Sequence, residues 1–211
     1  MINIYLVRHA QSTGNIEKRL TGMQNYELTK EGKIQVEKLT KQLDSIQFEA
    51  VYSSPSIRVI DTVKKLAKKN NLQVQILQEL GEMYFGIYDG YKWEDVNKIN
   101  PSISAMHRKT NEIMGIPEQE TSEQVADRMY EIIEKIAREN KDNTNILIGS
   151  HGVSIEAFLR KVTKVPFIEQ IQEYSQKNTC VNIIEYMANI NSFNLKTLNS
   201  TKHLELNLEE E

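Results

Sequence analysis

The stretch Leu6-Val7-Arg8-His9-Ala10-Gln11-Ser12 ends an apolar N-terminal run with a cation and an imidazole, and Ser150-His151-Gly152 ends another apolar run in the same way. In α/β chains, polar residues at the carboxyl ends of strands lie where such folds place their ligand sites. We therefore expect His9 and His151 to meet, although they are far apart in the sequence. A histidine that attacks phosphorus needs cations around the phosphoryl oxygens, and Arg8 adjoins His9. The pattern indicates phosphoryl chemistry.

Apolar runs alternate with helical patterns along the rest of the chain. Strands are predicted at residues 2–7, 50–53, 74–77, 145–149, 181–186 and 193–198, with the last two antiparallel. Helices are predicted at residues 32–44, about 54–71, 121–136 and 153–162. This alternation favours an α/β fold, a three-layer sandwich with a mostly parallel central sheet flanked by helices. Residues 93–115 break the alternation, so we expect a single domain over residues 1–211 with a small helical cap inserted at about 91–120.

Two of the predicted helices have recognisable beginnings. Ser54-Pro55 is typical of an N-cap followed by proline at the first helical position. Its apolar stripe would contain Ile57, Ile60, Val63 and Leu66. Thr121 and Gln124 form a capping-box pattern at the start of the later helix. The inner face of that helix would contain Val125, Met129, Ile132 and Ile136.

The composition limits the kinds of binding partner and the cellular compartment that we expect for this chain. The 211 residues include 26 Lys and Arg against 29 Asp and Glu, which gives no broad basic face for nucleic acid or an anionic membrane. No apolar run approaches the roughly 20 residues that cross a bilayer, and the N-terminus has no signal-peptide pattern. Cys180 is the only cysteine, which excludes an intrachain disulfide and favours a buried, inert thiol. These features predict a soluble protein of the reducing cytoplasm.

Five short motifs then occur in an order that resembles a known family. They are residues 6–12, Leu28-Thr29-Lys30-Glu31-Gly32, Ser53-Ser54-Pro55 followed by Arg58, Glu82 followed by Phe85-Gly86, and Ser150-His151-Gly152. In this order and spacing the chain resembles the histidine phosphatase superfamily, in its phosphoglycerate-mutase-like branch. Residues 199–204 resemble a common ending of small phosphatases in that branch.

The resemblance implies a role for each site residue. His9 would be the nucleophile and would carry a phosphohistidine, with no metal and no cofactor required. Arg8 and Arg58 would clamp the phosphoryl oxygens, and His151, if protonated, would add a third donor. Asn15 and Gly152 would complete the phosphate site.

Chemistry alone does not select the general acid. Glu79, Glu82 and Asp89 are all carboxylates that could protonate a leaving alkoxide. The resemblance selects Glu82, because it precedes Phe85-Gly86 at the family spacing. The selected group would later deprotonate the water that attacks the phosphohistidine.

Structural explanations compete with each assignment when a residue is taken alone. Arg58 and Glu82 would then be ordinary capping or surface residues, and the two histidines would be satisfied loop residues. His107 and His203 match no catalytic position and are expected at the surface. A His-His-Glu set also suits zinc, but two neighbouring arginines disfavour a dication and favour phosphate. Ala10 and Asn25 depart from residues common in relatives, which affects substrate contacts rather than the nucleophile.

Three functions follow from this reading. The first is a metal-independent phosphatase that hydrolyses small phosphomonoesters through His9. The second is a phosphoglycerate mutase, disfavoured because residues 90–121 form a shorter segment than mutases carry and would exclude water less well. The third is a phospholigand-binding protein without turnover. The sequence does not select the natural substrate; the candidates are sugar phosphates, phosphoserine, nucleotides and α-ribazole phosphate. It also leaves open whether the chain forms a homodimer through the late strands.

Overall fold

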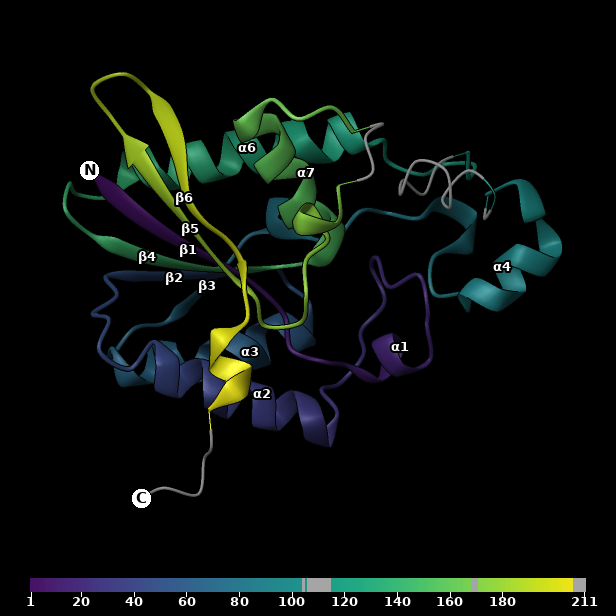
Figure 1. Ribbon diagram of the computed structural model, residues 1–211, viewed down its shortest axis with the longest axis horizontal. Coiled ribbons are helices and arrows are strands. Elements are labelled where there is room, and N and C mark those ends of the chain that lie inside the picture. The colour runs from purple at the N-terminus through teal and green to yellow at the C-terminus, as the bar shows by residue number, and fades with distance from the viewer. Residues whose placement is uncertain (104, 106–114, 168–170, 207–211) are drawn as a thin grey trace.

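A six-stranded sheet crosses the centre of the computed structural model, which describes residues 1–103, 105, 115–167 and 171–206 (Figure 1). The strands are β1 Ile2–Arg8, β2 Ala50–Ser53, β3 Val74–Ile76, β4 Asn145–Ser150, β5 Val181–Met187 and β6 Ser192–Ser200. They lie in the order β3-β2-β4-β1-β5-β6. The first four are parallel, whereas β5 is antiparallel to both β1 and β6. The predicted mostly parallel sheet with a late antiparallel pair is confirmed.

Helices cover both faces of this sheet and complete three layers. The helices α2 Lys30–Gln42 and α3 Ile57–Lys69 lie below the sheet in Figure 1, and α6 Ser122–Glu139 and α7 Gly152–Thr163 lie above it. Shorter elements are α1 Thr13–Ile16, α4 Trp93–Ile99 and the 3₁₀ turns η1 Gln78–Leu80, η2 Gly86–Tyr88, η3 Gln172–Tyr174 and η4 Lys202–Glu205. The predicted α/β sandwich is therefore confirmed.

The central strands are apolar because helices cover them on both sides. Leu6, Leu147 and Ile148 have no solvent exposure, as expected for strands buried on both faces. One hydrophobic cluster contains Ile4, Ile146 and side chains of α6 and α7. A second contains Leu147 with side chains of α2 and α3. The sheet thus has a rigid support on each face, and its strand ends are fixed relative to one another.

The beginning of α6 is confirmed, whereas that of α3 differs from the prediction. Thr121 accepts a hydrogen bond from the Gln124 amide, and the capping box forms as expected. In α3 the N-cap is Ser56 rather than Ser54, and Ile57 of the predicted inner stripe is 41% exposed. The buried face of the helix contains Arg58 and Val59 together with Val63 and Leu66. Arg58, which the predicted apolar stripe does not include, therefore faces the interior.

Two further expectations concern segments outside the strands. His203 is not at the surface as predicted but is 1% exposed, because η4 folds back onto α2. The cap expected at about 91–120 includes α4, while residues 104 and 106–114, with His107, lie outside the described residues. The single domain with a cap insertion stays a prediction. Among the helices described, none has the length and apolar character to cross a bilayer.

Candidate active site

The pairing of β1 with β4 brings the two histidine motifs together. Arg8 lies opposite Ser150 in the parallel register, and the His9 amide donates to the Ser150 carbonyl over 3.1 Å. The ring centroids of His9 and His151 are 5.4 Å apart. The structure therefore places the two imidazoles side by side at the carboxyl end of the sheet.

The His9 imidazole is buried and oriented by its own backbone. Its exposed fraction is 1%, and Nδ1 lies 2.8 Å from the Ala10 carbonyl. A carbonyl only accepts, so Nδ1 carries the hydrogen and Nε2 keeps its lone pair. Burial, followed by the charges of Arg8 and Arg58, holds the His9 pKa well below its usual value of 6.5. The side chain is thus a neutral imidazole with a nucleophilic nitrogen.

His151 is also neutral, and both of its ring nitrogens have partners. Nδ1 accepts from Arg58 Nη2 over 3.1 Å, so Nε2 carries the hydrogen and donates to Ser54 Oγ over 2.8 Å. Burial, followed by the charge of Arg58, holds the His151 pKa well below 6.5. In this state Nδ1 is an acceptor for the Arg58 guanidinium. A protonated His151 as a third donor to phosphate stays a prediction.

Arg58 reaches the site from α3 and is completely buried. Its Nη1 donates to the Gln24 carbonyl over 2.8 Å and its Nη2 to the Thr21 carbonyl over 2.8 Å. Arg8 Nη1 donates to the Gln176 carbonyl. Burial lowers the pKa of each arginine, although both lie within the field of Glu82. The Nε groups of Arg8 and Arg58 are buried without a partner among the described residues, a state that an anion would relieve.

Glu82 lies over the N-terminus of α7. Its Oε1 accepts from the Ser154 amide over 3.0 Å, and Oε2 accepts from the Val153 amide over 3.2 Å. Donors at a helix N-terminus stabilise a carboxylate. The two rival carboxylates lie elsewhere: Glu79 is exposed, and Asp89 accepts from the amides of Gly22 and Met23. Among the three candidates, only Glu82 faces the cavity described next.

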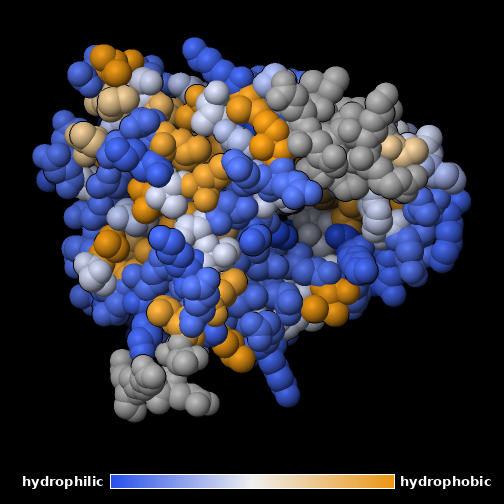
Figure 2. All heavy atoms as spheres, viewed as in Figure 1, coloured by the Kyte–Doolittle hydropathy of each residue, from blue (hydrophilic) through white to orange (hydrophobic). Residues whose placement is uncertain are grey.

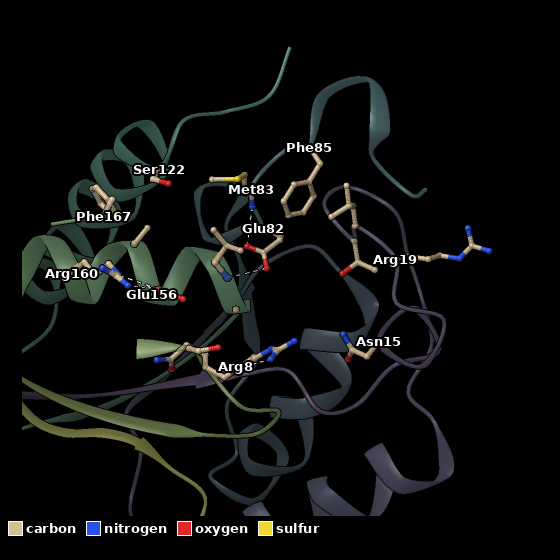
Figure 3. Close-up of a pocket in the computed structure, with 17 residues that line it drawn as sticks. Arg8, Asn15, Arg19, Glu82, Met83, Phe85, Ser122, Glu156, Arg160 and Phe167 are labelled. Atoms are coloured by element: carbon tan, nitrogen blue, oxygen red, sulfur yellow. Dashed lines mark hydrogen bonds and ion pairs between the residues drawn. The ribbon is translucent and has the colours of Figure 1, made fainter. Parts of the chain in front are cut away.

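A cavity of about 310 Å³ opens at this end of the sheet, and Figure 2 shows the surface hollowed near α1 and the start of α7. Arg8, Asn15, Glu82 and Gly152 line its inner end, and Figure 3 shows the first three directed toward a common space. Asn15 Oδ1 accepts from the Ser12 amide over 3.0 Å. The guanidinium of Arg19 points away from this space.

His9, Arg58 and His151 do not line that cavity but lie directly behind it. Gly152 leaves room for the Arg8 guanidinium, because a Cβ at this position would lie 3.3 Å from Arg8 Nε. The sequence-predicted site residues therefore come together in two groups: Arg8, Asn15, Glu82 and Gly152 line the cavity, whereas His9, Arg58 and His151 are buried beside it.

Sequence reasoning did not identify the residues that hold these groups in place. Arg128 on α6 donates to the carbonyls of Glu79, Gly81 and Glu82 and forms an ion pair with Glu120 at 2.8 Å. Ser54 belongs to a quoted motif, but its contact with His151 has no local signal in the sequence. Gln176 and Asn178 lie in a loop without periodicity. Within the described ranges, no group of three or more His, Cys, Asp or Glu side chains is arranged to hold a metal ion.

Comparison with known proteins identifies the family. The family model of the histidine phosphatase superfamily (branch 1) matches residues 4–201. The chain is 28% identical to a metal-independent phosphoserine phosphatase of Arabidopsis thaliana, covering 76% of this chain and 68% of the relative. It is 27% identical to a 2,3-bisphosphoglycerate-dependent phosphoglycerate mutase of Pelagibacter ubique, covering 78% and 82%. YhfR of Bacillus stearothermophilus has the same fold, with a TM-score of 0.90 at 22% identity over 97% of this chain and all of that one. The chain belongs to the histidine phosphatase superfamily, as the motifs predict.

Proposed function

We propose that the protein is a metal-independent phosphatase that hydrolyses small phosphomonoesters through a phosphohistidine on His9. The observation that carries this proposal is the neutral His9 imidazole, whose Nε2 keeps its lone pair close to the positive charges of Arg8 and Arg58. A nucleophile of this kind needs no metal-activated water for the first step. The similarity to a metal-independent phosphoserine phosphatase supports the same chemistry.

The first step transfers the phosphoryl group to the protein. The bond between Nε2 and phosphorus forms as the bond from phosphorus to the ester oxygen breaks, and a protonated Glu82 supplies the hydrogen to the leaving alkoxide. The negative charge of the bound phosphate favours the proton on the adjacent carboxyl group. Arg8, Arg58 and Asn15 neutralise or bind the equatorial oxygens, whose charge is spread in the transition state.

The second step hydrolyses the phosphohistidine and regenerates His9. Glu82, now ionised, accepts a proton from water as the water oxygen bonds to phosphorus and the bond to Nε2 breaks. The products are inorganic phosphate, a neutral His9 and a protonated Glu82. The three hydrogen bonds that Glu82 accepts from the amides of Met83, Val153 and Ser154 hold the carboxylate in one place for both steps.

A mutase is the alternative, because curated phosphoglycerate mutases match this chain as closely as phosphatases do. A mutase returns the phosphoryl group to a second hydroxyl and must exclude water while the phosphohistidine exists. The short segment between the acidic motif and α6 favours hydrolysis. We also propose that the protein acts in the cytoplasm on a small phosphomonoester and forms a homodimer.

Hydrolysis of p-nitrophenyl phosphate in EDTA, by the wild-type chain and His9→Ala, tests the proposal. We expect wild-type turnover in EDTA and none in the variant, which should still bind vanadate because the arginines remain. Activity that disappears with EDTA would contradict the metal-independent mechanism. Normal activity in His9→Ala would exclude the covalent intermediate. Tight vanadate binding by a wild type with no turnover would instead indicate a phospholigand-binding protein.

A further inference from the structure

The turn Asn178-Thr179 contacts two residues of the candidate phosphate site from behind. The Asn178 amide group donates to the His9 carbonyl over 3.0 Å and to Asn15 Oδ1 over 3.2 Å. The Thr179 backbone amide also donates to the His9 carbonyl, over 3.3 Å. A displacement of this turn therefore moves the backbone of His9 and the side chain of Asn15 together.

The backbone of this turn is strained. Thr179 has a φ of 55° and no solvent exposure. A β-branched residue rarely adopts positive φ, because its Cβ substituents crowd the backbone. Such conformations cost of order 1–3 kcal/mol and persist only where surrounding contacts fix them. The contacts that fix Thr179 therefore matter for the geometry of His9.

The Thr179 hydroxyl makes two of these contacts. It donates to the Asn178 carbonyl over 2.7 Å, which uses its single hydrogen. It must then accept from His203 Nε2, which lies 2.8 Å away. The hydrogen is therefore on His203 Nε2, and burial together with the charge of Lys38 lowers the His203 pKa to about 4, so the imidazole is neutral near pH 7. Its Nδ1 is buried without a hydrogen-bond partner in the part of the chain that the structure describes.

The unpaired Nδ1 indicates that His203 is present for its Nε2 contact and not for packing alone. A leucine would fill similar space without burying an unsatisfied nitrogen, a cost of about 1–3 kcal/mol. The ring is carried by η4, which packs against α2 (Figure 1). Lys38 of α2 fixes this turn by donating to the Leu204 carbonyl over 2.8 Å. The C-terminal turn is thus anchored to the body of the fold.

We propose that His203 is a positioning residue that locks the strained turn Asn178-Thr179 and thereby holds His9 and Asn15 in place for phosphoryl transfer. It acts through hydrogen bonds in series, from the imidazole to Thr179 and from the turn to the two site residues. His203 touches neither the cavity nor the substrate. This inference rests on the proposed function only for its kinetic readout.

The test compares two pairs of variants that act on one hydrogen bond. His203→Ala removes the donor, whereas His203→Gln keeps an N–H at the position of Nε2. Thr179→Ala removes the acceptor, whereas Thr179→Ser keeps it. We expect His203→Ala and Thr179→Ala to lower kcat for p-nitrophenyl phosphate by about 10-fold to 100-fold, the scale of a slight misplacement of reacting groups. The Gln and Ser variants should recover most of the loss, and KM should change less than kcat.

The loss of kcat in a double variant distinguishes a positioning role of His203 from a general loss of protein stability. The double variant His203→Ala/Thr179→Ala should lose no more activity than Thr179→Ala alone, because Thr179→Ala already deletes the contact that His203→Ala removes. Lys202→Ala is the matched control, because Lys202 is an exposed residue of the same 3₁₀ turn η4, and its kcat should stay at the wild-type value. If His203→Ala does not fold, the comparison of kcat between Thr179→Ala and Thr179→Ser tests the proposal instead.

Wild-type kcat in a folded His203→Ala, or additive losses in the double variant, would overturn the inference. A wild-type chain without phosphatase activity would contradict the proposed function alone. In that case vanadate affinity replaces kcat as the readout, because Asn15 is expected to contact the bound anion. Affinity that falls in His203→Ala and recovers in His203→Gln would then support the positioning role, and unchanged affinity would refute it.

Discussion

At the scale of single residues, Glu82 carries the most specific chemical expectation. Its carboxylate is fixed by donors from the N-terminus of α7 and faces Arg8 across the cavity. As a general acid it matters most for esters whose alkoxide cannot leave without a proton. Nitrophenolate is a stable anion and needs little protonation. The leaving group therefore distinguishes an acid from a residue that only shapes the site.

We expect Glu82→Gln to lower kcat/KM for glycerol phosphate by about 10²-fold or more, the usual contribution of a general acid, and to affect p-nitrophenyl phosphate less. Steady-state kinetics with both esters measures the difference. Glu79→Gln is the matched control, because this neighbouring carboxylate is exposed. Equal losses on the two esters would show that Glu82 is not the acid.

At the scale of elements, α6 holds the acidic loop in place through one side chain. The Arg128 guanidinium binds three carbonyls between residues 79 and 82 and pairs with Glu120, which also accepts from the Tyr84 amide over 2.9 Å. Burial opposes the charge of Glu120, but the hydrogen bonds from Arg128 and Tyr84 outweigh it and lower its pKa. The loop that carries Glu82 therefore follows the position of α6.

Replacing Arg128 with methionine should reduce kcat by about 10-fold or more through misplacement of Glu82. It should also lower the free energy of unfolding by roughly 1–3 kcal/mol, as expected for lost hydrogen bonds to a charged group. Kinetics and urea unfolding check both effects. Arg138→Met, on an exposed face of the same helix, should change neither. A folded Arg128→Met variant with wild-type kcat would contradict this role.

The elements also show what the sequence could predict. Hydrophobic periodicity locates β1, β4 and α6 to within a few residues, because their buried faces set the pattern. The strand ends then predict His9 and His151 as neighbours. The start of α3 could not be predicted, because Ser54 is engaged by His151 and the N-cap lies two residues beyond it, at Ser56. Such contacts join residues about a hundred positions apart and leave no local signal. The buried state of His203 depends on the return of η4 to α2 and was missed for the same reason.

At the scale of the whole molecule, three buried neutral histidines make stability depend on pH. Burial, followed by the charges of Arg8 and Arg58 or of neighbouring groups, lowers the pKa of His9 and His151 well below 6.5. Burial and the charge of Lys38 lower the pKa of His203 to about 4. In the unfolded chain each titrates near its ordinary value of about 6.5. Between these values the unfolded state binds more protons than the folded state does, so stability falls as the pH falls.

We therefore expect the free energy of unfolding to decrease from pH 7 toward pH 4, by at most about 1.4 kcal/mol per pH unit for each histidine. For His203 the contribution is fully present above 6.5 and is lost progressively as the pH approaches 4. Urea unfolding at several pH values in this window measures the slope. His203→Gln is the matched control, because glutamine does not titrate, and its slope should be smaller by about one proton. An unchanged slope in that variant would mean that His203 is protonated in the folded protein as readily as in the unfolded chain, which would contradict its buried, neutral state.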